Sequence, residues 1–174
     1  SITSLGYSCF RGCSSLASIE LPSSITSLGE FCFQNCSSLT SINLPSSITS
    51  LEYKCFYNCS SLASINLPSS ITSLGENCFE KCSHLTSMLC LAVEPPSCIL
   101  SNYTDTHNTS LVNNTMRLYV PKESKEKYKQ NDAWNSAKGI YPLYPTSSVS
   151  LVKEVSVDKA KPKKLEYTIM PENA

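Results

Sequence analysis

The chain has 174 residues, a formal net charge of zero at pH 7 and only 16% charged residues. This balance argues against nucleic-acid binding, which needs Lys and Arg clustered on one face of a protein. No apolar run is long enough to cross a bilayer, so we expect no membrane span.

A 23-residue unit recurs from the first residue onward and determines the expected fold. It carries three signatures: Ser-Ile-Thr-Ser-Leu from Ser1, Ser24, Ser47 and Ser70; Cys-Phe-x-x-Cys from Cys9, Cys32, Cys55 and Cys78; and Leu-x-Ser-Ile-x-Leu from Leu16, Leu39 and Leu62. A fixed period of this length predicts a solenoid, in which each unit buries its apolar edge by stacking on the next. Solenoids present long repetitive surfaces rather than pockets, which favours binding over catalysis. Because the chain opens inside a unit, we expect it to be part of a longer protein.

Each coil of this solenoid is expected to have a strand on one side and a short helical turn on the other. In the second unit, Ile42 and Leu44 alternate with polar residues, as a half-buried strand requires. Pro45 ends that strand because it has no N–H group, and residues 30–36 are predicted to form the helical turn. The residue before each second cysteine is expected to adopt the left-handed backbone conformation that Gly and Asn tolerate. These residues are Gly12, Asn35 and Asn58, whereas Lys81 in the fourth coil departs from the preference and marks a weaker coil.

Ten cysteines are present, and eight of them occupy two fixed positions of the repeat. The eight are Cys9, Cys32, Cys55 and Cys78 at the first position, and Cys13, Cys36, Cys59 and Cys82 at the second. A free cysteine packs as a small apolar residue, so we expect buried thiols and no metal or other cofactor. Zinc held by thiolates of adjacent coils is one alternative. Disulfides are another, although parallel Cβ vectors on stacked coils suit an S–S bond badly.

The motif Leu-Thr-Ser-Ile-Asn-Leu-Pro-Ser-Ser-Ile-Thr-Ser-Leu, followed by Cys-Phe-x-x-Cys-Ser-Ser-Leu, resembles the BspA-like leucine-rich repeat over residues 1–92. Family members usually carry Ala where Cys32, Cys55 and Cys78 stand, a change that keeps a small side chain. The resemblance implies a right-handed leucine-rich-repeat solenoid that is β-rich, with one short helical turn per coil. It also implies a bacterial protein of Bacteroides type, secreted or on the cell surface, that acts in adhesion to host matrix proteins and other cells.

Residues 93–145 are expected to form an irregular last coil with an insert. The segment Arg117–Pro121 restores the strand pattern, and its Leu118 matches Met88 at a separation of 30 rather than 23 residues. The extra residues are placed in the polar stretch 101–115, which is predicted to be a surface loop.

A C-terminal helical cap is expected to follow this last strand. Residues 122–130 are predicted to form a short helix, with Glu123 and Lys127 as a favourable i,i+4 pair. Tyr128 and Trp134 are the predicted apolar anchors of the cap. The run from Leu118 onward also resembles the terminal segment of BspA-like proteins.

Residues 146–174 resemble the first two strands of a bacterial group 2 Ig-like domain. About 30 residues cannot close a sandwich that needs ~100 residues. We therefore expect either a truncated Ig-like domain or a tail that pairs as an extra hairpin.

Catalytic residues are scarce in this sequence. His84 and His107 are the only histidines. A Cys82–His84 pair would have poor geometry, because the two residues are close in sequence on a corner and no acid is placed to orient the histidine. We therefore predict that the chain is not an enzyme.

The outward positions of the predicted strands are small, polar and nearly uncharged, and they are the candidate ligand-binding residues. They are Ser18, Glu20, Ser41, Asn43, Ser64, Asn66 and Ser87. We predict a monomeric adhesion or protein-interaction module that binds an extracellular protein or glycan through this extended face. Two alternatives stay open: a structural spacer without a ligand of its own, and a glycan-binding accessory domain.

Overall fold

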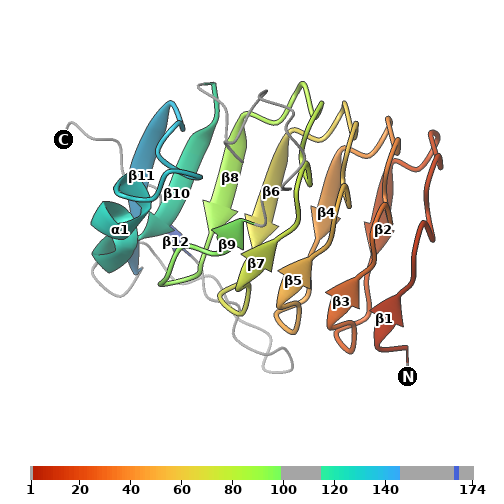
Figure 1. The fold of residues 1–174 in the computed structure, drawn as a ribbon, viewed down its shortest axis with the longest axis horizontal. Coiled ribbons are helices and arrows are strands. Elements are labelled where there is room, and N and C mark those ends of the chain that lie inside the picture. Colours follow the sequence, from red (N-terminus) through yellow and green to blue (C-terminus); the bar gives the residue numbers. More distant parts are fainter. Residues whose placement is uncertain (1, 99–114, 146–166, 169–174) are drawn as a thin grey trace, which may run out of the picture.

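The computed structural model describes residues 2–98, 115–145 and 167–168. The chain winds into a stack of parallel β-coils, with the first coil at one end and the helix α1 at the other (Figure 1). The β-rich solenoid predicted from the 23-residue period is confirmed. Within the described part of the chain, no helix has the length and apolar character that a membrane crossing requires.

Two sheets run along the stack, and their strands are parallel except for the last one in the sequence. The short-strand sheet has the order β1-β3-β5-β7-β9 and contains β1 (Ser4–Leu5), β3 (Ser27–Leu28), β5 (Ser50–Leu51), β7 (Ser73–Leu74) and β9 (Ser97–Cys98). The long sheet has the order β12-β11-β10-β8-β6-β4-β2 and contains β2 (Ser18–Glu20), β4 (Ser41–Asn43), β6 (Ser64–Leu67), β8 (Ser87–Cys90), β10 (Arg117–Pro121), β11 (Gly139–Pro145) and β12 (Tyr167–Thr168). The sequence pattern does not predict the short-strand sheet, because a Ser-Leu dipeptide is too short to show alternation.

Equivalent residues of successive coils pair directly with one another. Ile19 pairs with Ile42 in the long sheet, and Ser27 pairs with Ser50 in the short-strand sheet. Each pairing spans one repeat, so like side chains stack on like. Polar side chains also bridge the coils: the Thr72 hydroxyl donates a hydrogen bond to the carbonyl oxygen of Thr49 over 3.1 Å.

The stacked apolar side chains form one continuous core. Phenylalanines at one repeat position make a ladder of nearly parallel rings, with centroid separations of 5.2 Å for Phe10–Phe33, 5.3 Å for Phe33–Phe56 and 5.6 Å for Phe56–Phe79. The apolar positions predicted for the second coil are buried, except for the half-buried Leu44. The buried ones are Ile25, Leu28, Cys32, Phe33, Cys36, Leu39 and Ile42.

Six of the eight repeat cysteines lie in this core, as predicted. They are Cys32, Cys36, Cys55, Cys59, Cys78 and Cys82. Cys9 and Cys13 are exposed instead, which corrects the expectation for the first coil. Only one neighbouring coil packs against these two residues in the described structure, so half of their surroundings is solvent.

The turn segment of each coil is built from tight turns rather than from the predicted helical turn. In the second coil, the N–H groups of Cys32, Gln34 and Cys36 each bond to the carbonyl oxygen three residues earlier. The alternate N–H groups, such as that of Phe33 to the oxygen of Cys55 at 2.8 Å, bond to the following coil instead. A continuous helix would direct every N–H along its own axis, so the bonds between coils exclude it.

Left-handed residues produce this alternation. The predicted left-handed position is confirmed at Gly12, Asn35 and Asn58, and Lys81 adopts the same conformation although the sequence predicts a weaker coil there. A second left-handed position, which the sequence analysis missed, comprises Ser8, Phe31, Lys54 and Asn77.

The last coil and the cap close the solenoid as predicted. Leu118 pairs with Met88, and β11 then adds to β10. The buried Tyr128 donates from its hydroxyl to the carbonyl oxygen of Ala92 over 2.9 Å. The buried Trp134 donates from Nε1 to the carbonyl oxygen of Pro96 over 3.1 Å. Both anchors therefore combine apolar burial with a satisfied polar atom.

One contact predicted for the cap is wrong. Lys127 pairs with Glu94 of the preceding coil, not with Glu123. The reason is that Glu123 belongs to the 3-10 turn η1 (Lys122–Ser124), whereas α1 comprises Lys125–Lys129. The i,i+4 geometry of a continuous α-helix therefore does not relate Glu123 and Lys127.

The predicted insert and tail fall largely outside the described residues. Of the stretch 101–115, only Thr115 is described, and of 146–174, only β12. That strand pairs antiparallel with the end of β11, where Thr168 lies opposite Tyr144. The Ig-like resemblance of this tail stays a hypothesis.

Candidate functional site

The outward face of the long sheet carries the predicted ligand-binding residues in two aligned rows. One row contains Ser18, Ser41, Ser64 and Ser87, and the other contains Glu20, Asn43 and Asn66. All are exposed except the half-buried Ser87. The parallel register therefore brings these residues together on one face, although their role in binding stays a prediction.

Both rows continue onto the last two strands, where the chemistry of the face changes. The register extends the first row from Ser87 to Arg117 and then to Gly139. It extends the second row through Leu89, Tyr119 and Tyr141. We call Leu89, Arg117, Tyr119 and Tyr141 the tyrosine strip. The strip adds residue types that dominate binding energy at interfaces to an otherwise Ser/Asn surface.

The two tyrosine rings pack against each other at a tilt. Their centroids lie 5.3 Å apart and their planes differ by 31°. A Cβ atom added at Gly139 would lie 2.7 Å from the hydroxyl oxygen of Tyr141 and 2.8 Å from its ring. The ring of Tyr141 therefore lies along the strand, over the space that Gly139 leaves empty.

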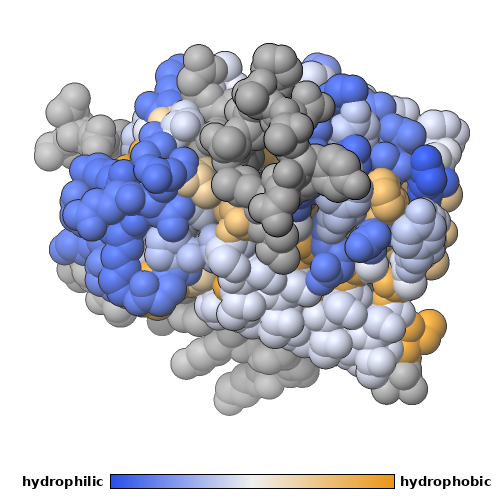
Figure 2. Space-filling model, in the orientation of Figure 1, coloured by the Kyte–Doolittle hydropathy of each residue, from blue (hydrophilic) through white to orange (hydrophobic). Residues whose placement is uncertain are grey.

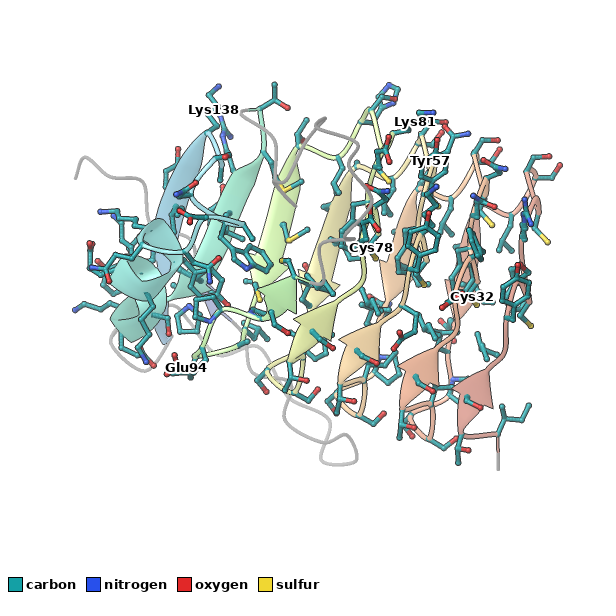
Figure 3. The ribbon with its side chains drawn as sticks, in the orientation of Figure 1. Cys32, Tyr57, Cys78, Lys81, Glu94 and Lys138 are labelled. Carbon is teal, nitrogen blue, oxygen red and sulfur yellow. The ribbon has the colours of Figure 1, made fainter. Side chains whose placement is uncertain are left out.

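The charge around the strip is positive. Arg117 is exposed on β10, and the Lys122 ammonium lies 5.1 Å from the ring centroid of Tyr144 at the end of β11. Lys138 immediately precedes β11, and Figure 3 places it at the outer rim of the same end of the solenoid. The outward positions of β8 and β10 hold no carboxylate. This region therefore favours ligands with anionic or hydrogen-bond-accepting groups.

The sequence held a signal for this strip. The match of Leu118 to Met88 already places Arg117 and Tyr119 beside Ser87 and Leu89 on the outward face. Tyr141 follows the cap and carries no repeat motif, so only the structure brings it into the row.

A second cluster of aromatic and cationic side chains lies on the turn segments. We call it the aromatic–cation ridge, and its members are Tyr7, Arg11, Phe31, Tyr53, Lys54, Tyr57 and Lys81. The ring of Phe31 packs edge-on against Tyr7 at 5.5 Å and against Tyr53 at 5.1 Å. Figure 3 shows Tyr57 and Lys81 of neighbouring coils projecting together from the turn corner.

Every cation of the ridge lies over an aromatic ring. Arg11 Cζ is 5.5 Å from the centroid of Phe31. Lys54 Nζ lies 4.9 Å from the ring of Tyr53 and 5.2 Å from that of Tyr57, and Lys81 Nζ lies 5.0 Å from Tyr57. Interaction with Tyr53, and less strongly with Glu80, raises the pKa of Lys54; interaction with Tyr57 does the same for Lys81. The ridge therefore gathers three positive charges beside aromatic rings.

Phe31 is the unexpected member of this ridge. Its φ is 57°, in the left-handed region that costs a side-chain-bearing residue roughly 1–2 kcal/mol. The same repeat position is held by Ser8, Lys54 and Asn77, so the coil does not require an aromatic residue there. The left-handed backbone belongs to every coil, but the coil does not need the exposed aromatic ring, and a residue that keeps such a ring at a strained position is a candidate for a functional role.

The histidine chemistry considered from the sequence has no structural support. His84 is exposed, and its Nδ1 lies 2.6 Å from the carbonyl oxygen of Ser60 rather than beside Cys82. The described residues contain no group of three or more potential metal ligands.

Surface character varies along the solenoid. Figure 2 shows a pale, weakly polar band over the short-strand sheet and a strongly hydrophilic surface over α1. The pale band reflects the Ser and Thr residues that recur in every coil.

Comparison with known proteins supports the repeat assignment. The family model for the BspA type leucine rich repeat region (6 copies) matches residues 1–93. A leucine-rich repeat protein of T. pallidum is 28% identical, with 53% of each chain covered and a TM-score of 0.42. A leucine-rich repeat protein of Bacteroides ovatus is 18% identical, with 71% of this chain and 57% of that chain covered and a TM-score of 0.24. The chain therefore spans little more than half the length of these solved relatives. No curated protein matches it.

Proposed function

Because the chain belongs to the BspA-type leucine-rich repeat family, we propose that it is an adhesion module of a cell surface or the extracellular space. Leucine-rich repeats are protein-interaction modules in general, and this family and fold are typically non-enzymatic. BspA-type proteins are generally surface or extracellular proteins. A matrix protein or another cell-surface ligand is the partner that fits this setting.

The observation that carries the proposal is the continuous outward face of the long sheet. Its Ser and Asn rows offer many weak hydrogen-bonding groups, each contributing roughly 0.5–1.5 kcal/mol net. Its tyrosine strip adds Tyr119, Tyr141 and Arg117, the residue types that anchor interfaces. A ligand that lies along the sheet would use the strip as its anchor and the rows as its extended contact.

A second candidate function is glycan binding, and the adjacent tyrosine pair favours it. Two neighbouring tyrosine rings offer apolar area to a sugar ring, while Arg117 and the neighbouring Ser87 supply donors. In this function the chain would be an accessory domain that holds a carbohydrate.

The test is a binding screen of the chain against immobilised matrix proteins and a glycan array. We expect saturable binding to a protein ligand, and expect Tyr119→Ser to weaken it by about tenfold or more. Ser41→Ala, on β4 and three strands away from Tyr119, is the control and should have a smaller effect, because the Ser row makes only weak contacts. Binding to glycans alone would favour the second candidate. No binding in either screen would favour the spacer, which has no ligand of its own.

A further inference from the structure

We propose that the aromatic–cation ridge is a second binding surface, and that it takes an acidic, extended peptide segment of a protein partner. The ridge lies on the turn segments, away from the outward face of the long sheet. The proposal therefore does not depend on the tyrosine strip or on the ligand of that strip.

The ridge has the residue types of a binding hot spot and exposes them. Tyr7 is 66% exposed, and Phe31, Tyr53 and Tyr57 are half-buried. Tyrosine, phenylalanine and arginine are enriched at protein interfaces, and the aromatic rings supply rigid contact area at a low cost in side-chain entropy. The strained Phe31 stands at the centre of this set, in contact with Tyr7, Tyr53 and Arg11.

The three cations of the ridge are held in place but unpaired. Ion pairs between described residues join only Lys127 to Glu94 and Lys129 to Glu126. Arg11, Lys54 and Lys81 have no such partner, although Glu80 lies near enough to raise the pKa of both lysines. Stacking on aromatic rings restricts these side chains before a ligand arrives, which lowers the entropy lost on binding. Carboxylates form strong, charge-assisted hydrogen bonds with such cations.

Two buried acceptors in the same coils also lack a donor. Gln34 is only 8% exposed, and its Oε1 has no hydrogen-bond partner. The hydroxyl of Ser8 is buried without a partner as well. Gln34 occupies the same repeat position as Arg11 and Tyr57, which are members of the ridge in the coils on either side. A rotation of its side chain toward solvent would allow it to accept a hydrogen bond from a peptide N–H group.

Ring geometry favours a peptide over an anionic glycan. The planes of Phe31 and its two tyrosine neighbours differ by 73° and 89°, so these rings pack edge-on and face different directions. The side chains of an extended acidic peptide can contact such rings one by one, and the peptide supplies both carboxylates for the cations and N–H donors for Gln34. A carboxylated or sulfated glycan would supply charge, but its sugar rings pack best on a flat aromatic face.

The test uses a fluorescein-labelled peptide of repeating Glu-Ser units and fluorescence anisotropy with the whole chain. We expect binding that weakens with salt, and that Phe31→Asn and Lys54→Gln each reduce affinity by about tenfold. Thr86→Ser, outside the ridge, is a control for nonspecific effects. Arg117→Gln tests whether the acidic peptide binds the positively charged tyrosine strip instead of the ridge.

Each other outcome overturns the proposal. Loss of binding in Arg117→Gln, with Phe31→Asn unaffected, would locate the acidic ligand on the tyrosine strip. Equal binding of a Lys-Ser repeat would remove the charge argument. Binding of a heparin-derived oligosaccharide but not of the peptide, with the same dependence on Lys54, would make the ridge a glycan site. Absence of binding to the Glu-Ser peptide would reject the ridge as an acidic-peptide surface while leaving the long-sheet function intact.

Discussion

The thiol of Cys59 donates a hydrogen bond to the carbonyl oxygen of Phe33 in the preceding coil, over 3.1 Å. The thiols of Cys36 and Cys82 make the same contact with the coils before them, also at 3.1 Å. The oxygen of Phe33 already accepts the N–H of Cys36, so the thiol uses its second lone pair. These cysteines are therefore weak donors that join coils as well as small apolar residues.

Burial of these thiols makes the stability of the fold depend on pH in the alkaline range. It raises the pKa of Cys32 and Cys82 from 9.0 to about 12 and that of Cys36 to about 11. The folded chain therefore keeps these thiols neutral while the unfolded chain ionises them from pH 9.0 upward. We expect full stability below pH 9.0 and a progressive loss between pH 9.0 and about 12. Urea unfolding at pH 7 and at about pH 10 measures this loss. The variant with Ala at both Cys36 and Cys82 should lose less stability than the wild type between the two pH values. An equal loss of stability in both proteins would show that other groups cause it.

The reactivity of the ten cysteines follows their burial. In the native chain, Cys9 and Cys13 should react quickly with a thiol reagent because both are exposed. The buried thiols should react only after unfolding, when the count should rise to all ten. The measurement is a thiol titration without reductant, before and after denaturation. A count of four or fewer in the unfolded chain, or zinc bound in stoichiometric amounts, would contradict the assignment of packed free thiols.

The phenylalanine ladder should dominate the stability of the central coils. Phe56 is fully buried and stacks on both Phe33 and Phe79. We expect Phe56→Ala to lower the free energy of unfolding by ~3–5 kcal/mol, because the neighbouring rings cannot close the cavity. Phe10→Ala is the matched control: Phe10 is partly buried and stacks on Phe33 alone in the described structure, so its loss should be smaller. A change under about 1 kcal/mol for Phe56→Ala would reject the ladder as a source of stability.

Substitution of Phe31 should change the stability much less than substitution of Phe33 in the same turn. Phe33 is fully buried, whereas Phe31 is half-buried and left-handed. In Phe31→Asn, relief of roughly 1–2 kcal/mol of backbone strain should offset the lost ring contacts. We expect a change in the free energy of unfolding below about 1 kcal/mol, compared with ~3–5 kcal/mol for Phe33→Ala. Urea titrations of the two variants provide the comparison. A large loss for Phe31→Asn would mean that its ring serves the fold rather than a partner.

The sequence predicts most of the coil because each stacked contact repeats at the same interval. Ile42 and Leu44 show strand alternation, Asn35 shows the left-handed turn, and Leu118 shows the resumed register. The Ser-Leu strands escape prediction because two residues carry no periodicity. The left-handed position of Phe31 cannot be predicted for another reason. Its equivalents Ser8 and Lys54 share no chemical property that would reveal the backbone conformation.

The functional surfaces are harder to predict than the coil. The Ser and Asn rows follow from the repeat itself, but Tyr141 joins them only through pairing of β11 with β10. The ridge depends on residues from different repeat positions, such as Phe31 and Tyr53, whose contact reflects side-chain direction rather than spacing in the sequence. Sites formed by residues that differ from the repeat consensus can therefore be recognised only in the folded structure.

The most direct test of the proposed function is a surface plasmon resonance titration of a ligand found in the binding screen. It compares the wild type with Gly139→Ala. The added methyl group displaces the flexible ring of Tyr141 from the space over Gly139 without removing any contact of the core. A thermal melt should show that the variant stays folded. If the long sheet is the binding face, affinity should fall by about tenfold while the melting temperature changes little. Unchanged affinity in this variant and in Tyr119→Ser would contradict the account and place the ligand elsewhere on the solenoid.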